Sequence, residues 1–470
     1  MNSQLQACID QVEKDYAVDK KLLCDAFDAF IKSMDEGLTS KEQKRECMPM
    51  IPTFVSRIPT GKENGLYLAG DLGGTNFRVC SVRLNGDHTF SLTQSKSRIP
   101  SELMKGNQGL ELFRYLAKKV SAFLNEHHAE YSCATDGRLK LGFTFSFPVN
   151  QQALDKGTLL RWTKGFDLPN VVGKDIVELF QLQLDELDAP VDVVALANDT
   201  VGTLLSRAYS NDISKSNAHT VIGCIFGTGT NGAYFESADK IKKIDVPGNG
   251  MVINTEWGSF DNTLQVLPSN RFDTIVDSET ANKGYHRFEK RISGMFLGEL
   301  LRVTLKCLAD DGQLFAKLKE ERGGSLPHRL EEPWQLDSQV LSYLEIDDST
   351  ELRMSGLILE NELRLTTTFE ERLAIRAITR AISKRAGLLS SIPIAAIVSR
   401  VKDRYKDDDR DFEVGCDGSV VEFYPGFQDR VYEGLGMIDA LKGLNKKVYL
   451  RIAKDGSGVG AALCASTVDN

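Results

Sequence analysis

Two glycine-rich turns, each placed between apolar runs, constrain this chain more than any other feature. The first is Gly-Asp-Leu-Gly-Gly-Thr-Asn at 70–76, and the second is Gly-Thr-Gly-Thr-Asn-Gly at 227–232. Because glycine has no Cβ, successive backbone N–H groups of such a turn can converge on an anion, and the threonine hydroxyls add donors. Two such turns in one chain predict a polyphosphate held from both sides, which indicates ATP.

The surroundings of the turns distinguish them from other nucleotide-binding motifs. The second turn satisfies G-x-G-x-x-G, but a dinucleotide fingerprint opens a helix, whereas an extended run follows here at 233–236. The chain has no His-Arg-Asp or Asp-Phe-Gly motif of a protein kinase, and neither Gly-Lys pair is followed by Ser or Thr. An ordinary hairpin is the alternative for either turn alone. Asp71 favours phosphate binding, since it could hold Mg²⁺ through water.

Composition narrows the classes of partner. The 470 residues are expected to form about two or three domains. A net charge of -9 argues against nucleic acid or an anionic membrane as the main partner. Nine cysteines without a Cys-x-x-Cys pair indicate reduced thiols, and the polar N-terminus shows no secretory signal, so we expect a cytoplasmic protein. The apolar run at 386–398 is too short to span a bilayer and reads as a buried segment.

Strand-like and helix-like segments alternate, which is typical of an α/β protein. The recurrence of a strand, a Gly-Thr-Asn turn and a second strand indicates internal duplication. An irregular segment is expected at 148–165. The expected helices are 19–37, 110–127, 175–187, 200–209, 288–308, 370–390 and 459–465, and strands are expected at 66–92, 139–147, 191–197, 221–226, 233–235 and 413–417.

Several polar residues stand in apolar surroundings. Asn198 and Asp199 follow an apolar run and open a helix, so a carboxylate there can lie at the mouth of a sheet. The alternative is that they only cap the helix. Buried polar groups need partners, and a polyhydroxylated ligand would supply several. Each could instead be a satisfied core residue or a surface charge. The other residues of this kind are Ser146, Thr163, Lys164, Glu256 and Glu289.

The order of these motifs resembles the hexokinase family, and within it the fungal-type glucokinases. The most specific match is Leu-Gly-Phe-Thr-Phe-Ser-Phe-Pro at 141–148, followed by Trp-Thr-Lys-Gly-Phe at 162–166. The resemblance runs from about Asp19 to Ala465. The other matching segments are 70–78, 198–200, 227–231, 254–258, 288–290, 415–419 and 455–460.

The resemblance implies the actin-like ATPase fold, with two duplicated α/β lobes around a cleft. The small lobe would comprise 60–197 plus 456–470, and the large lobe 1–59 plus 198–455. It also implies that Asp199 is the catalytic base. Lys164 and the Thr228 hydroxyl would neutralise charge on the transferring phosphoryl group. The implied sugar contacts are Ser146, Thr163, Lys164, Asn198, Asp199, Asn231, Glu256 and Glu289. The implied nucleotide contacts are Asp71, Gly73, Gly74, Thr75, Asn76, Gly227, Thr228, Gly229, Thr230, Gly415, Asp417, Gly418 and Ser419, with Asp71 orienting Mg²⁺ through water.

The implied activity is phosphorylation of glucose at its 6-hydroxyl by MgATP, the first step of glycolysis, with closure of the lobes on the sugar. Mannose is a second candidate substrate, and fructose is the doubtful one. The protein would be a monomer or a homodimer. Two alternatives stay open: a non-catalytic sugar sensor on the same fold, and an actin-like or chaperone-type ATPase with a protein partner.

Overall fold

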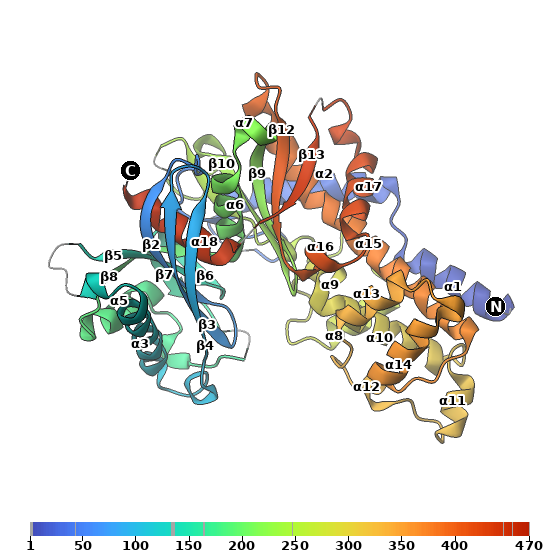
Figure 1. Ribbon diagram of the computed structural model, residues 1–470. Coiled ribbons are helices and arrows are strands. Elements are labelled where there is room, and N and C mark those ends of the chain that lie inside the picture. Colours follow the sequence, from blue (N-terminus) through green and yellow to red (C-terminus); the bar gives the residue numbers. More distant parts are fainter. Residues whose placement is uncertain are drawn as a thin grey trace.

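The computed structural model describes residues 3–42, 44–132, 137–162, 165–246, 248–444, 446–453 and 455–469. Two β-sheets lie on either side of a pair of helices, α6 (Asp199–Ser210) and α18 (Gly456–Ser466), as Figure 1 shows. Helix α18 packs on the smaller sheet, α6 packs on the larger one, and the two helices pack on each other. The molecule therefore has two lobes joined through these two helices.

The smaller sheet has the strand order β4-β3-β2-β5-β8. Its first three strands pair antiparallel, and β5 and β8 add in parallel. Helices α3 and α5 pack together over it, on the left in Figure 1. The bounds are β2 (Asn64–Leu72), β3 (Asn76–Asn85), β4 (Phe90–Arg98), β5 (Leu139–Phe145), β8 (Val191–Ala197), α3 (Gly109–His127) and α5 (Ile176–Glu186), with α4 (Ala129–Ser132) after α3.

The larger sheet has the order β1-β11-β10-β9-β12-β13. Apart from β1, it repeats the plan of the smaller sheet, because two antiparallel pairings are again followed by two parallel ones. This shared topology confirms the internal duplication. The bounds are β1 (Ile51–Pro52), β9 (Ala218–Phe226), β10 (Thr230–Ser237), β11 (Gly250–Asn254), β12 (Asp411–Asp417) and β13 (Val448–Ile452).

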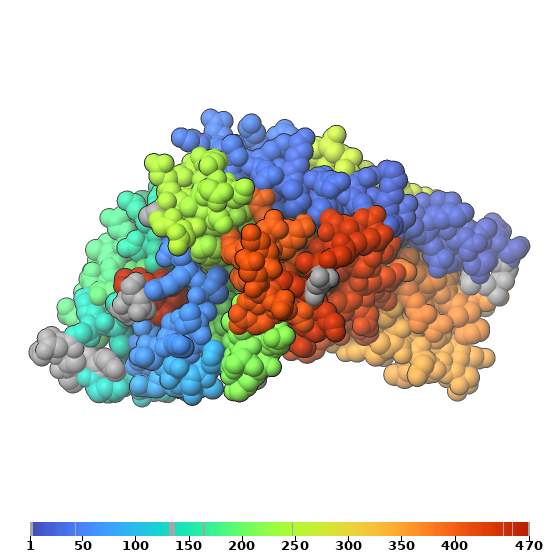
Figure 2. All heavy atoms as spheres, turned by 90° about the horizontal axis from the view of Figure 1, so that it is seen from above, coloured from blue at the N-terminus to red at the C-terminus, as the bar shows by residue number. Residues whose placement is uncertain are grey.

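Helix α15 contacts the larger sheet, and helices from both ends of the chain pack around it. The N-terminal helices α1 and α2 pack on α15, and α2 also touches α17; Figure 2 shows the blue N-terminal segment lying along the red C-terminal part. The bounds are α1 (Ser3–Tyr16), α2 (Lys20–Thr39), α7 (Ile213–Ser216), α8 (Arg271–Ser278), α9 (Glu289–Ile292), α10 (Gly294–Asp310), α11 (Ala316–Glu321), α12 (His328–Glu331), α13 (Ser338–Ile346), α14 (Arg353–Leu363), α15 (Phe369–Val401), α16 (Ser419–Phe423) and α17 (Phe427–Met437).

Small residues allow α6 and α18 to cross closely. A Cβ on Gly460 would overlap the Cα of Gly202, and a Cβ on Gly202 would lie 2.5 Å from the carbonyl oxygen of Gly456. Any larger side chain at these positions would push the helices apart. Around the crossing, one apolar cluster contains residues of α6, α18 and both sheets, among them Val201 and Val459.

The strands of the smaller sheet fall within 64–197, and those of the larger sheet fall within 51–52 and 218–452. The exact lobe boundaries stay a prediction.

Four predicted elements differ from the structure. Helix α2 continues past Gly37, which is a packing residue because a Cβ there would overlap the carbonyl oxygen of Met48. The predicted helix 288–308 is broken at Ser293, whose backbone is extended. The segment 148–165 contains a hairpin of β6 (Val149–Ala153) and β7 (Lys156–Leu159). Helix α15 runs beyond Ser390 to Val401.

The apolar run at 386–398 is buried, as predicted, and lies inside α15. By length and composition the segment 369–405 could cross a membrane, but 89% of its apolar window is buried inside the protein. Burial of this kind is typical of the central helix of a globular lobe.

Candidate active site

The predicted base lies where the chain passes from one lobe to the other. Strand β8 ends at Ala197, Asn198 caps helix α6, and Asp199 is its first residue. The Asn198 Oδ1 accepts hydrogen bonds from the backbone N–H of Thr200 at 2.9 Å and from its hydroxyl at 2.6 Å. The predicted alternative, a capping role, is therefore correct for Asn198.

A cluster of amides holds Glu256 beside this carboxylate. The Glu256 Oε1 accepts hydrogen bonds from Asn254 Nδ2 at 2.8 Å and from Asn231 Nδ2 at 3.2 Å. Glu256 has a left-handed backbone with φ of 53°. Burial raises the pKa of its carboxyl, and the charge of Asp199 raises it further. Residues from β10, from the loop after β11 and from α6 thus meet in one place.

The second glycine turn touches the other predicted sugar-binding carboxylate. The backbone N–H of Thr230 donates to Glu289 Oε2 at 3.0 Å. His286 Nδ1 lies 3.6 Å from Glu289 Oε1. Burial lowers the pKa of His286 to about 4, and the positive charge of Arg161 acts in the same direction, so the imidazole is neutral at pH 7. The sequence analysis missed His286 and Arg161, and only the folded chain brings them to this site.

The second turn also packs against the predicted adenosine segment. Gly418 has φ of 114°, and a Cβ there would lie 2.6 Å from the carbonyl carbon of Phe226. Thr228 and Ser419 are exposed beside this contact. Gly415, in contrast, lies within β12, where a Cβ would be 2.7 Å from the Cβ of Arg207 on α6. Its lack of a side chain is explained by helix packing, and its nucleotide role stays a prediction.

The N-terminus of α10 donates backbone hydrogen bonds to the second glycine turn. The N–H of Gly294 donates to the carbonyl oxygen of Gly227 at 2.7 Å, and that of Met295 donates to Thr228 at 3.1 Å. Gly227 N–H donates to the Gly229 carbonyl at 3.0 Å. These bonds explain the break before α10, because its first donors bind the turn instead of continuing the preceding helix.

Asp71 lies at the end of β2 in a network that reaches the C-terminal helix. Its Oδ2 accepts from Arg78 Nη2 at 3.2 Å and from Ser457 Oγ at 2.9 Å. Arg78 also donates to Asp455 Oδ1 at 3.3 Å and hydrogen bonds Ser457. Burial raises the pKa of Asp417, and Asp455 contributes to the shift, which places Asp417 near this network. Arg78 was missed by the sequence analysis, although it lies inside the matched segment 70–78.

Gly73 of the first turn lies next to Ser146. A Cβ on Gly73 would be 3.6 Å from Asp71 Oδ1 and 3.9 Å from Ser146 Oγ. Gly74 has φ of 85°, which favours glycine. The Thr75 carbonyl accepts from Ile99 N–H at 2.9 Å, and the Asn76 side chain lies 3.4 Å from the Thr75 hydroxyl. Thr163 and Lys164 lie outside the described residues, so their roles stay predictions.

The residues present fit a water-mediated magnesium ion better than a directly bound one. Among the described parts of the chain, no group of three or more His, Cys, Asp or Glu residues could hold a metal ion. Asp71 already accepts two hydrogen bonds on one oxygen and is half-buried, so it can orient metal-bound water with the other.

Comparison with known proteins agrees with this arrangement. Two hexokinase family models match the chain, one over residues 8–209 and the other over 221–467. Glucokinase-1 of Saccharomyces cerevisiae is 46% identical over 97% of this chain and 96% of its own length. Glucokinase of Aspergillus niger is 45% identical over 93% of this chain and 92% of its own length.

Solved structures agree as well. The hexokinase of Schistosoma mansoni complexed with glucose superposes with a TM-score of 0.83 and 35% identity, covering 99% of both chains. A second hexokinase crystal structure gives a TM-score of 0.85 at 30% identity. The predicted α/β fold with two duplicated actin-like lobes is thereby confirmed. With family models matching both lobes and glucokinases matching nearly the whole length, this chain belongs to the hexokinase family.

Proposed function

We propose that this chain is a glucokinase-type hexokinase, which transfers the γ-phosphoryl group of ATP to the 6-hydroxyl of glucose. One observation carries the proposal: the turn predicted to bind phosphate and the carboxylates predicted to bind sugar are in direct contact. Thr230 N–H, at the end of the phosphate turn, donates to Glu289, while Asp199 is close enough to Glu256 to raise its pKa. Neither the described residues nor the comparisons favour the non-catalytic sugar sensor.

Asp199 acts as the general base. Its carboxylate accepts the proton of the 6-hydroxyl as the sugar oxygen bonds to the γ-phosphorus and the bond to ADP breaks. The N-terminus of α6 holds this carboxylate in place, because Asn198 and Asp199 both accept from Thr200. Thr228, exposed on the second turn, and Lys164 neutralise charge on the transferring group. Magnesium, when bound through water at Asp71, supplies further positive charge against the phosphates.

Hydroxyl recognition falls to Asn231, Glu256 and Glu289. All three are half-buried. A carboxylate of Glu256 or Glu289 without a hydrogen-bond donor is therefore costly, and a sugar hydroxyl that donates to it is favoured. Inverting a hydroxyl leaves an acceptor unpaired, which is the physical basis for preferring glucose, with mannose second. Sugar contacts from both lobes would draw the lobes together about α6 and α18.

The proposal extends to the cellular setting. The eight described cysteines are all free thiols, which supports a reducing compartment such as the cytoplasm. Phosphorylation of glucose there would be the first step of glycolysis. Monomer and homodimer both fit.

The test is the Asp199→Ala variant in a coupled assay of ADP release. We expect turnover with glucose and MgATP to fall by roughly 10²–10⁴, the usual contribution of a general base. Glucose binding, followed by calorimetry, should persist in the variant and serves as the control for folding. Unchanged turnover in a folded variant would remove Asp199 from the mechanism, and wild-type protein that binds glucose without releasing ADP would be a sensor.

A further inference from the structure

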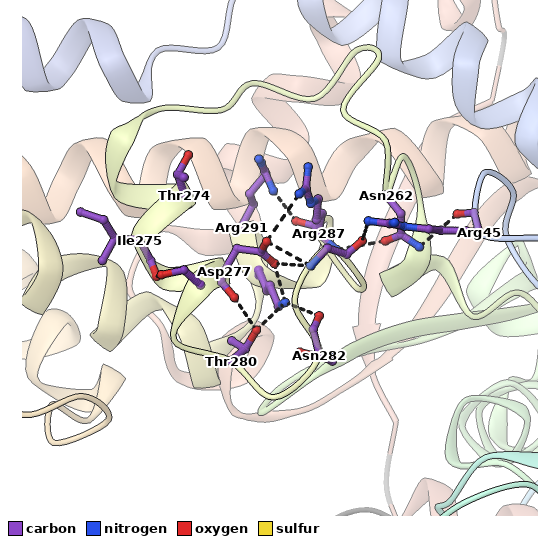
Figure 3. A network of polar contacts seen from close by, with 12 residues as sticks. Arg45, Asn262, Thr274, Ile275, Asp277, Thr280, Asn282, Arg287 and Arg291 are labelled. Atoms are coloured by element: carbon purple, nitrogen blue, oxygen red, sulfur yellow. Dashed lines mark hydrogen bonds and ion pairs between the residues drawn. The ribbon is translucent and has the colours of Figure 1, made fainter.

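A cavity of about 50 Å³ lies between α8 and α9, and charged side chains form most of its wall. One water needs only ~10–15 Å³ of such space, so the cavity has room for a small polyatomic ion. Its charged residues are two carboxylates and three cations, several of which are drawn in Figure 3. They are Asp273, Asp277, Arg287, Lys290 and Arg291.

Other cations already neutralise the two carboxylates. Arg385, which stands behind the cavity wall, donates to both oxygens of Asp273 at 2.7 and 2.8 Å. Asp277 Oδ1 accepts from Lys290 Nζ at 2.7 Å, and the Gly284 N–H lies 3.0 Å from each oxygen. Arg287 and Arg291 are therefore left with weaker anionic neighbours: Arg287 has a long ion pair with Asp277, and Asp273 and Asp261 act on Arg291 through their charges.

Arg291 and Arg287 have no strong anionic partner of their own. Arg291 is 3% exposed and donates only to backbone carbonyls, those of Pro268 at 2.7 Å and Arg287 at 2.6 Å. In the described chain it forms no ion pair. The Nε of Arg287 is buried with no partner among the described residues, and its Nη2 is 3.5 Å from Asp277. Buried charged groups in proteins are normally paired, so two guanidinium groups that line one cavity without a close carboxylate of their own leave room for a bound anion.

We propose that this cavity binds a tetrahedral oxyanion, inorganic phosphate, between Arg287 and Arg291. The forked donors of a guanidinium match the oxygens of such an ion better than a spherical halide. The Ser269 hydroxyl lines the same wall and adds a donor. Hydrogen phosphate also carries a P–OH group, which can donate a hydrogen bond to the Asp277 carboxylate. Sulfate has no such proton at neutral pH.

Lys290 links this pocket to the sugar site. Its ammonium donates to Asp277, to the Thr280 hydroxyl at 2.8 Å and to the Asn282 carbonyl at 3.0 Å, which fixes the chain entering α9. Glu289 is the residue before it. If Glu289 binds the sugar as proposed, an anion that orders this loop raises the affinity for glucose. The pocket would then act as an effector site. By linkage, glucose raises phosphate affinity by the same factor.

The experiment is a calorimetric titration of inorganic phosphate into the sugar-free protein, with the nucleotide site filled by ADP. We expect saturable binding at one site, weaker sulfate binding, and tighter phosphate binding once glucose is added. Arg287→Met should weaken phosphate roughly 10- to 150-fold, which corresponds to one charge-assisted hydrogen bond. The matched control is Arg45→Met: Arg45 donates to the Gly284 carbonyl and stacks on Tyr285 outside the cavity wall, so phosphate affinity should not change.

Melting curves establish that both variants are folded. A titration without saturation, or equal phosphate affinity in the two variants, would overturn the proposal. Glycerol phosphate distinguishes the sources of the oxyanion. If it competes with inorganic phosphate in the wild-type protein and this competition is lost in Arg287→Met, the pocket accepts any phosphoryl group. If it does not compete in the wild-type protein, the pocket accepts only the free ion. Failure of the proposed function looks different, because phosphate would still bind while glucose would neither be phosphorylated nor shift phosphate affinity.

Discussion

Replacing Glu256 by Gln tests the sugar-binding carboxylate with the least change of shape. Both amides that hold Glu256, those of Asn231 and Asn254, donate to its Oε1. In the described part of the chain, Oε2 accepts no hydrogen bond, so it is the oxygen left for a sugar hydroxyl. In the variant the amide oxygen can keep the two Asn contacts. The NH₂ group then presents a donor where the sugar requires an acceptor.

The expected magnitude follows from the loss of that single bond. A hydrogen bond to a charged group contributes about 1.5–3 kcal/mol, which corresponds to a rise of roughly 10- to 150-fold in the KM for glucose. The bond is present in both the ground state and the transition state, so kcat should change much less than KM. The KM for ATP should stay the same, because the contact of Glu256 with the second turn is at Asn231, a predicted sugar contact, and not at the predicted nucleotide contacts 227–230.

The pH dependence provides a second readout. Burial and Asp199 raise the pKa of Glu256, so this carboxyl takes up a proton at a higher pH than an exposed one. The wild-type KM for glucose should therefore be constant above that pKa and rise as pH falls through it. The variant has no carboxyl at position 256 and should lose this rise. Initial rates of ADP release across glucose concentration and pH measure both effects. An unchanged KM, or the same acid rise in the variant, would refute the reasoning.

Two further predictions concern the nucleotide turn and the core. Gly418→Ala should raise the KM for ATP, measured from steady-state rates, without changing the KM for glucose. The reason is that its Cβ would lie 2.7 Å from the Gly227 nitrogen, at a φ of 114°. Equal effects on both KM values would contradict this. Arg385→Met should lower the free energy of unfolding by about 3–5 kcal/mol in urea titrations, since the buried Asp273 carboxylate would lose its ion pair and, among the described residues, keep only the hydrogen bond from the Asn270 N–H. The exposed Arg329→Met is the control and should cost less than about 1 kcal/mol.

Local patterns in the sequence predicted elements whose stabilising contacts are themselves local. Helices α2 and α5 begin where expected, because Asp19 and Asp175 accept hydrogen bonds from backbone N–H groups two or three residues ahead. Their apolar faces recur with the helical period, which any window of the sequence displays.

The length of α15 could not be predicted in the same way. Its serines look like breakers, but in the buried helix Ser390 donates to the carbonyl of Ala386 and Ser391 donates to that of Leu388. Pro393 is accommodated inside the same helix. Packing on several neighbouring helices stabilises this segment more than local propensity opposes it.

The sequence by itself determined the kinds of group in the active site: glycine turns for phosphate, and carboxylates and amides for hydroxyls. Only the tertiary structure decided which groups meet. Arg78 reaches Asp455 across most of the chain length, Gly418 closes on Gly227, and Arg287 and Arg291 line one cavity. Such contacts depend on strand order and helix crossing, which are set by burial summed over whole lobes, and no local pattern of residues records that sum.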